Sequence, residues 1–152
     1  MKKYIIFSFF LFSAYVSAQE INWLSLSEAE AAQKENPDKP YFIDFYTDWC
    51  GWCKRMDQST FKEAEVVKHI NENYIPVKFD AETKENVIFK GKIYKYVQAQ
   101  NGRGVNAFAY FSLKGKLSYP SYAVINSKGE TERHLIGFMP KDKLIEGLTV
   151  QP

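Results

Sequence analysis

Two cysteines, Cys50 and Cys53, constrain this chain more than any other feature of its sequence. They are its only cysteines, and they lie in the run Trp-Cys-Gly-Trp-Cys-Lys at 49–54, just after an apolar run at 41–46. The apolar run predicts a buried strand, and the residues after it predict a helix. A helix N-terminus stabilises a thiolate, so the first cysteine is expected to be the reactive one. A bridge over two intervening residues closes too small a loop to stabilise a fold strongly, which favours a redox role over a structural one.

The N-terminal segment has the pattern of a secretory signal. Two lysines at 2–3 precede an apolar stretch at 4–15, and Val16-Ser17-Ala18 supplies the small residues of a cleavage site. We expect cleavage after Ala18, which leaves a single domain at 19–152 in the periplasm or outside the cell. A membrane anchor is the alternative interpretation, but it needs roughly 20 apolar residues. No later segment is apolar enough to enter a membrane, so we expect no membrane insertion after removal of the signal.

The charge balance argues against one class of partner. Two of the 20 Lys and Arg residues lie in the signal, which leaves 18 basic side chains against 18 acidic ones. A net charge near zero is not typical of proteins that bind nucleic acids. An extracytoplasmic location would also place the cysteines in an oxidising compartment.

Hydrophobic periodicity predicts alternating helices and strands in the first half of the domain. The expected elements are a helix opened by a capping box at 27–30 and ending near Glu35, a strand at 41–46, a helix at 49–58, a helix at 62–71 opened by a capping box at 60–63, and a strand at 75–79. The last four form a β-α-β unit.

The second half contains a segment that we interpret as an insertion, at about 82–104. Apolar runs at 86–89 and 93–97 flank Lys90-Gly91-Lys92 like a hairpin, and a loop at 98–104 follows. The remaining expected elements are a helix at 105–113, a strand at 121–125, a turn at 126–129, a return strand at 131–136 and a helix at 141–148. Helices on both sides of a partly parallel sheet make a three-layer assembly.

With Cys-x-x-Cys after its early strand, the chain resembles the thioredoxin superfamily. The resemblance covers the expected mature chain apart from the insertion. It is similar to small secreted thioredoxin-like proteins of bacterial envelopes and to the reductase domain at the C-terminus of membrane thiol-disulfide interchange proteins. The run Phe-Tyr-Thr-Asp-Trp-Cys-Gly-Trp-Cys-Lys-Arg-Met at 45–56 carries that likeness. The fold it implies is α/β, a thioredoxin-like three-layer α/β/α sandwich with a mixed central sheet.

Four residues are candidates for the chemistry. Cys50, at the start of the helix, is expected to be the attacking thiolate, and Cys53, one turn further in and shielded, the resolving thiol. Asp44 interrupts an apolar strand, so burial should raise its pKa. The resemblance implies that Asp44 lies behind the resolving cysteine and takes its proton, and that Lys78 pairs with it. The alternative is an acid at a strand end that reaches solvent.

Five further residues are candidates for substrate binding. Trp49 and Trp52 flank the thiols and would form an apolar rim, with Gly51 inside the motif. Trp52 stands where cytosolic thioredoxins commonly have proline. The resemblance implies that Pro120 has a cis peptide bond and faces the cysteines, so that Tyr119 can offer backbone groups to an extended substrate. An ordinary trans proline at a strand entry is the alternative.

The sequence therefore predicts an extracytoplasmic thiol-disulfide oxidoreductase, a reductase or an isomerase-supporting protein. It would act on protein or peptide dithiols and disulfides, exchange electrons with a membrane partner, and need neither a diffusible cofactor nor a metal. One alternative is a non-catalytic envelope binding module that recognises a partner through the insertion. Another is copper or zinc handling by the two cysteines with His69 or His134, although structural zinc usually takes four ligands.

Overall fold

The structure is a computed structural model that describes residues 20–100 and 102–149, so the predicted signal and its cleavage point lie outside the described residues. The elements are α1 (Leu26–Glu35), β1 (Tyr41–Tyr46), α2 (Gly51–Gln58), the 3-10 turn η1 (Thr60–Lys62), α3 (Ala64–Asn73), β2 (Ile75–Asp80), β3 (Val87–Phe89), β4 (Lys92–Tyr94), β5 (Tyr96–Val97), β6 (Val105–Asn106), α4 (Ala107–Ser112), β7 (Ser121–Ile125), β8 (Thr131–Ile136) and α5 (Lys141–Thr149). Over these residues, every helix is too short or too polar to span a bilayer.

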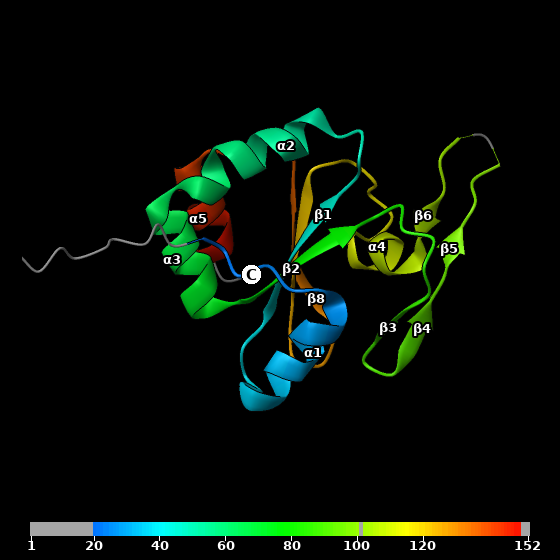
Figure 1. Ribbon diagram of the computed structural model, residues 1–152, viewed down its shortest axis with the longest axis horizontal. Coiled ribbons are helices and arrows are strands. Elements are labelled where there is room, and N and C mark those ends of the chain that lie inside the picture. The colour runs from blue at the N-terminus through cyan, green and yellow to red at the C-terminus, as the bar shows by residue number, and fades with distance from the viewer. Residues whose placement is uncertain (1–19, 101, 150–152) are drawn as a thin grey trace, which may run out of the picture.

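The central sheet has the strand order β2-β1-β7-β8 (Figure 1). β1 and β2 are parallel, and β7 is antiparallel to both of its neighbours, β1 and β8. The parallel pair needs a crossover, which α2, η1 and α3 supply. β1 lies in the interior of the sheet and is buried along most of its length, which explains its nearly continuous apolar sequence. A single bridge between Leu24 and Val77 extends the sheet beyond β2.

Helices cover both faces of the sheet and enclose two cores. α1 and α4 pack on one face, and α2, α3 and α5 pack on the other (Figure 1). In the first core the Phe108 ring lies 5.8 Å from Phe45 and 5.0 Å from Phe79. In the second, the rings of Phe42 and Tyr122 stack at 5.7 Å. The three-layer sandwich with a mixed sheet is confirmed.

Two helix starts differ from their predictions. Ser25, not Ser27, caps α1: its Oγ accepts a hydrogen bond from the Glu28 N–H at 3.4 Å, and its own N–H donates to the Glu28 carboxylate at 2.8 Å. The capping box predicted at Thr60 is wrong, because the Thr60 hydroxyl donates instead to the carbonyl of Met139 at 2.7 Å. Thr60 therefore lies in η1, and α3 begins without a side-chain cap.

The segment interpreted as an insertion folds into two short hairpins. β3 pairs with β4 as expected, whereas the pairing of β5 with β6 was not predicted. Val105 and Asn106, expected to open a helix, form β6, and the Asn106 amide donates to the carbonyls of Thr83 at 3.3 Å and Glu85 at 3.0 Å. We call residues 82–106 the arm. It extends from the side of the molecule that carries α4 (Figure 1).

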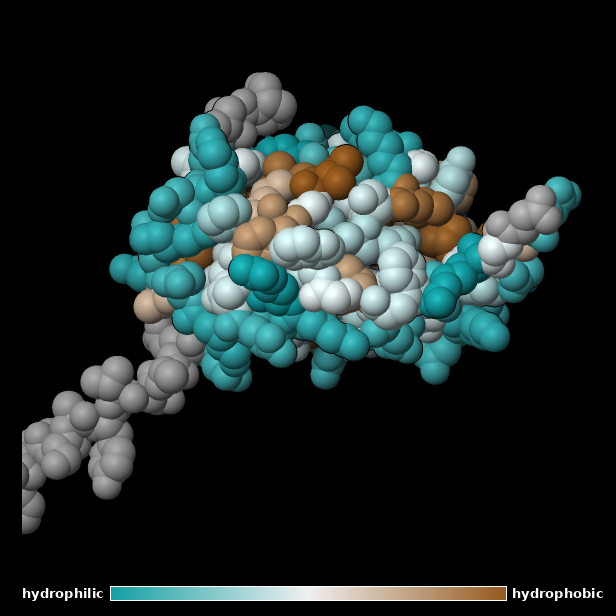
Figure 2. Space-filling model, turned by 90° about the horizontal axis from the view of Figure 1, so that it is seen from above, coloured by the Kyte–Doolittle hydropathy of each residue, from teal (hydrophilic) through white to brown (hydrophobic). Residues whose placement is uncertain are grey.

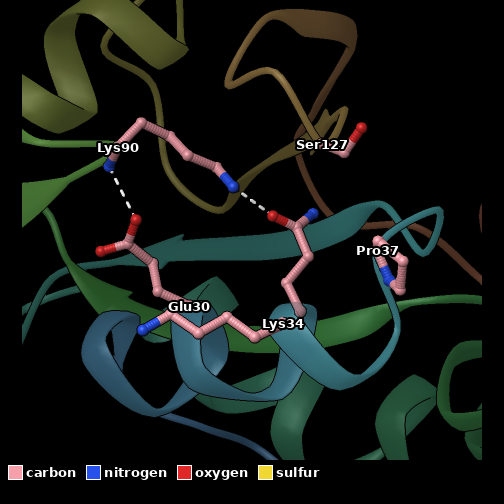
Figure 3. A pocket seen from close by; sticks show the side chains of 6 residues that line it. Glu30, Lys34, Pro37, Lys90 and Ser127 are labelled. Carbon is pink, nitrogen blue, oxygen red and sulfur yellow. Dashed lines mark hydrogen bonds between the residues drawn. The ribbon is translucent and has the colours of Figure 1, made fainter.

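The first turn of the arm is tied to α1 (Figure 3). The Lys90 N–H donates to the Glu30 carboxylate at 2.7 Å, and the Lys90 ammonium donates to the Gln33 side-chain oxygen. The Tyr41 hydroxyl donates to the same Gln33 oxygen at 2.7 Å. These contacts border a cavity of about 470 Å³ lined by Glu30, Gln33, Lys34, Pro37, Lys90 and Ser127. The arm is therefore fastened to the body of the domain.

Candidate active site

Cys50 and Cys53 form a disulfide at the N-terminus of α2, with sulfurs 2.03 Å apart. Cys50 is the N-cap residue, and its sulfur accepts a hydrogen bond from the Cys53 N–H at 3.0 Å. The free N–H groups of a first helical turn favour negative charge there, and this is the position expected for the attacking sulfur. Both cysteines are only 4% exposed. Cys53 is shielded as expected, and Cys50 is equally buried in the disulfide form, so helix position and not burial distinguishes the two.

The two tryptophans of the motif are exposed, Trp49 by 51% and Trp52 by 56%. The Trp49 ring meets Tyr119 edge-on at 6.1 Å, and the Trp52 ring lies 5.6 Å from Phe138. Viewed from above, onto α2, the middle of the molecule is pale to brown and is ringed by hydrophilic residues (Figure 2). Gly51 is exposed, and a Cβ there would meet nothing within 4 Å. These side chains form the expected apolar rim.

The peptide bond between Tyr119 and Pro120 is cis, as the resemblance implied. Pro120 directly precedes β7, and its carbonyl accepts a hydrogen bond from the Gly137 N–H at 2.8 Å. That bond joins the entry of β7 to the end of β8. Through the ring contact of Tyr119 with Trp49, the same turn reaches the residue before Cys50.

Asp44 lies in β1, directly opposite Lys78 of β2 and Tyr122 of β7, so the three side chains share one face of the sheet. Asp44 is 2% exposed, and one of its carboxylate oxygens lies 3.4 Å from the Lys78 ammonium. Burial raises the pKa of Asp44 to about 7, although the Lys78 charge acts to lower it. Its other oxygen, Oδ1, has no hydrogen-bond partner among the described residues. The prediction of a buried acid is confirmed, and the solvent-reaching alternative is wrong.

Asp57 is a site residue that the sequence reasoning missed. The Lys78 ammonium hydrogen-bonds to the Asp57 carboxylate, and so lies between that group and Asp44. Asp57 follows Cys53 by four residues on α2, which places both on the same side of that helix. A cavity of about 220 Å³ opens beside this ion pair, lined by Glu20, Ile21, Trp23, Asp57, Phe61, Lys62 and Lys78. The i, i+4 spacing of Cys53 and Asp57 is visible in the sequence. The lysine that connects Asp57 to Asp44 lies in β2, and its contacts are not visible there.

The arm also reaches the rim, which the sequence reasoning missed as well. The Trp49 indole N–H donates to the Glu82 carboxylate at 3.1 Å. The Arg103 guanidinium lies 5.0 Å from the centre of the Trp49 ring. No local pattern signals either contact, because both partners are more than thirty positions away in the chain.

In the part of the chain that the structure describes, no site is assembled that would support the metal-handling alternative. There, no three side chains of His, Cys, Asp or Glu converge as metal ligands. His69 lies on α3 with its ring 6.0 Å from that of Tyr74. His134 lies in β8, where burial, with Lys116 and Lys114 nearby, lowers its pKa.

Comparison with known proteins gives a family match over most of the chain. The family described as Thioredox_DsbH, protein of unknown function, DUF255, matches residues 8–133. The thiol:disulfide interchange protein DsbD of Neisseria meningitidis is 30% identical over 118 residues, which are 77% of this chain. The match spans only 16% of that DsbD, so this chain corresponds to one part of the relative.

Solved structures agree with that match. The oxidised C-terminal domain of Neisseria meningitidis DsbD has a TM-score of 0.53 and 30% identity, with 79% of this chain and 86% of that chain covered. A thioredoxin from Thermus thermophilus has a TM-score of 0.59 over 85% of both chains, and at 14% identity it shows the fold alone. The resemblance drawn from the sequence is confirmed. With a cysteine pair closing a disulfide at the head of α2 on this fold, the chain belongs to the DsbD/DsbH-like family (DUF255) of the thioredoxin superfamily and is similar to the C-terminal domain of DsbD.

Proposed function

We propose that this protein is an extracytoplasmic thiol-disulfide oxidoreductase that reduces protein or peptide disulfides or supports their isomerisation. The observation that carries the proposal is the position of Cys50 at the N-cap of α2, bonded to Cys53. The resemblance of the sequence to the reductase domain of membrane thiol-disulfide interchange proteins favours the reducing direction. The predicted signal ending at Ala18 supports the extracytoplasmic location.

The reaction proceeds in two exchanges. The Cys50 thiolate attacks one sulfur of a substrate disulfide, forms a mixed disulfide with it, and releases the other sulfur as a thiolate that takes up a proton. The Cys53 thiol then loses its proton and attacks the Cys50 sulfur. This step closes the Cys50–Cys53 disulfide and releases the second substrate thiolate. The substrate gains two electrons, and a dithiol of a membrane partner returns two electrons to the protein.

We propose that the Asp44 carboxylate accepts the proton that the Cys53 thiol loses in the second exchange. A carboxylate with a pKa of about 7 is charged often enough to accept a proton near neutral pH, and basic enough to hold it. Lys78 steadies the charged form from 3.4 Å and links it to Asp57, beside the cavity of about 220 Å³. That cavity supplies a route by which the proton returns to water. No cofactor or metal takes part in these steps.

The rim would hold the substrate as an extended segment. Trp49 and Trp52 offer apolar surface on the two sides of the disulfide, with Gly51 leaving the surface between them open. The backbone of Tyr119, before Pro120, is the edge with which a substrate strand would pair. The insertion at about 82–104 adds a further wall beside Trp49.

Mixed-disulfide trapping tests the assignment of the two cysteines. The reduced Cys53→Ser variant, mixed with a disulfide-bonded peptide, should accumulate a covalent adduct at Cys50, because no resolving thiol is present. The Cys50→Ser variant should form little adduct and lose exchange activity. Exchange that survives in Cys50→Ser would overturn the proposal and leave a binding module as the better hypothesis.

The reduction potential of the pair tests the direction. It is measured by equilibration with a series of glutathione ratios, with the fluorescence of Trp49 and Trp52 as the signal. A value near about −270 mV, that of thioredoxin, would support a reductant, whereas a value near about −120 mV would indicate a disulfide donor.

A further inference from the structure

Each of the two tryptophans beside the disulfide carries an arginine on its face. Arg103, from the arm, has its guanidinium 5.0 Å from the centre of the Trp49 ring. Arg55, from α2, lies 5.5 Å from the ring of Trp52 and 5.5 Å from that of Phe138. The two tryptophans that flank Cys50 in the sequence therefore each contact a guanidinium group, and the two groups come from separate parts of the chain. Stacking on an aromatic face fixes the plane of a guanidinium and leaves its edge of N–H donors open.

The contacts of the arm hold Arg103 in this place. Its neighbour Gly104 donates its N–H to the Tyr96 hydroxyl at 3.1 Å, and a Cβ at Gly104 would overlap both the Tyr96 ring and the Val97 carbonyl. At the base of the arm, the Asn106 amide bonds two carbonyls, and the Lys90 turn is fastened to α1. Arg103 is thus presented by an anchored hairpin.

Among the described residues, no carboxylate lies within hydrogen-bond distance of either guanidinium. Arg103 is 64% exposed on its side chain, and its nearest acid, Glu82, is 3.7 Å away, beyond hydrogen-bond distance. Glu82 also accepts the Trp49 indole N–H at 3.1 Å, so its charge is shared. Over the described residues, Arg55 forms no ion pair at all. Planar guanidinium donors match a carboxylate in two-point contact, which makes a substrate carboxylate the natural missing partner.

We propose that Arg103 and Arg55 are specificity-determining residues that select disulfide substrates with acidic residues near the reacting cysteine. The inference rests on the proposed function, since it names the substrate class of the same site. The partner is an extended polypeptide lying across the rim, with a carboxylate toward Trp49, toward Trp52 or toward both. Asp48 and Asp80 oppose this preference. The Asp80 carboxylate already accepts the Glu82 N–H at 2.9 Å, whereas Asp48 is exposed.

The test compares three disulfide-bonded peptides that differ only beside one cysteine, where they carry Asp, Asn or Lys, together with the neutral hydroxyethyl disulfide. For the full-length reduced protein we expect kcat/KM to fall from the Asp peptide to the Lys peptide by about three- to tenfold, and the difference to shrink at high salt. The Arg103→Met and Arg55→Met variants should each lose part of this preference. Each substitution should lower the reduction of the Asp peptide by a larger factor than the reduction of the uncharged hydroxyethyl disulfide.

Charge reversal separates selection from misfolding. Arg103→Glu should favour the Lys peptide over the Asp peptide, a gain that an unfolded arm cannot produce. Asp48→Asn should strengthen the preference for the Asp peptide. Lys95→Met removes an exposed charge from the arm away from these contacts, and it should leave the order of the peptides unchanged.

The outcomes distinguish the two proposals. A wild-type protein that reduces all four substrates without regard to charge overturns this inference alone. Equal losses on every substrate in Arg103→Met and Arg55→Met also overturn it, since they point to support of the tryptophans. A wild-type protein that reduces none of the substrates overturns the proposed function and this inference with it.

Discussion

Asp44 makes the stability of the fold depend on pH. Its pKa of about 7 in the folded protein lies above its usual value near 4, because burial disfavours the charged form. Between these two values the folded protein retains a proton that the unfolded chain has released. The free energy of unfolding therefore falls as the pH rises from about 4 to about 7.

Replacing Asp44 with Asn should remove this dependence. We expect Asp44→Asn to be more stable than the wild type at pH 8, by at most about 4 kcal/mol, and similar to it near pH 4. Unfolding of the oxidised proteins in guanidinium chloride at pH 5 and pH 8 measures the difference. Asp48→Asn, at an exposed acid, is the control and should show little change. A variant less stable than the wild type at pH 8 would contradict this account of the buried charge.

Tyr122 carries a second buried polar group on the same face of the sheet. Its hydroxyl has no hydrogen-bond partner among the described residues, and its ring stacks on Phe42 at 5.7 Å. Tyr122→Phe keeps the ring and removes the cost of burying the hydroxyl. We therefore expect the free energy of unfolding to stay level or to rise by about 1 kcal/mol. A loss of similar size in thermal and denaturant unfolding would show that the hydroxyl is hydrogen-bonded in solution.

At the scale of the elements, Gly104 decides how the second hairpin of the arm closes. Gly104→Ala would push a methyl group into the Tyr96 ring and the Val97 carbonyl. We expect a local cost of about 1–3 kcal/mol, which opens β5 and β6. Amide hydrogen exchange should therefore speed up in the arm and stay slow in β1. Gly51→Ala is the matched control, because a Cβ there meets nothing within 4 Å. Unchanged exchange in the arm would mean that the hairpin tolerates the methyl group.

The elements that the sequence predicted well are those with a long periodic pattern. β1 and the β-α-β unit follow from continuous apolar runs, and the return strand β8 follows from its turn. β5 and β6 have two residues each, too few for a pattern, and their pairing depends on the arm folding back. The cap of α1 was predicted two residues too late because Ser25 and Ser27 are both serines near the helix start, and Ser27 lies inside the helix. Thr60 does not cap a helix because its hydroxyl donates to the Met139 carbonyl, a tertiary contact that the local sequence does not reveal.

The same division applies to the site. Cys50 and Cys53 are neighbours in the sequence, and Asp44 is conspicuous as a lone acid in an apolar strand, so local patterns were enough to find them. Asp57 joins the site through its contact with Lys78, and Arg103 joins it through its contact with Trp49. In both cases the partner comes from a distant part of the chain. Spacing along one segment carries no information about such partners.

At the scale of the whole molecule, Phe108 connects the arm with the sheet. Its ring lies 5.8 Å from Phe45 in β1, 5.1 Å from Phe89 in β3 and 5.4 Å from Tyr94 in β4. Phe108→Ala would leave a cavity where α4, the sheet and the arm meet. We expect a loss of about 3–5 kcal/mol, with the arm and the sheet unfolding in one transition. Circular dichroism and arm-specific hydrogen exchange measure the two parts, and an arm that melts first would be a separate folding unit.

The two sides of the sheet differ in a way that bears on behaviour at high concentration. Beyond β2, the bridge from Leu24 already occupies part of the strand edge, whereas β8 is the last strand on the other side of the described sheet. Unpaired strand edges are where folded proteins seed cross-β fibres. On β8 the neighbouring charges of Glu132 and Arg133 interrupt the surface that a second copy would have to match. Fibre growth is thus obstructed by covering at one edge of the described sheet and by charge at the other.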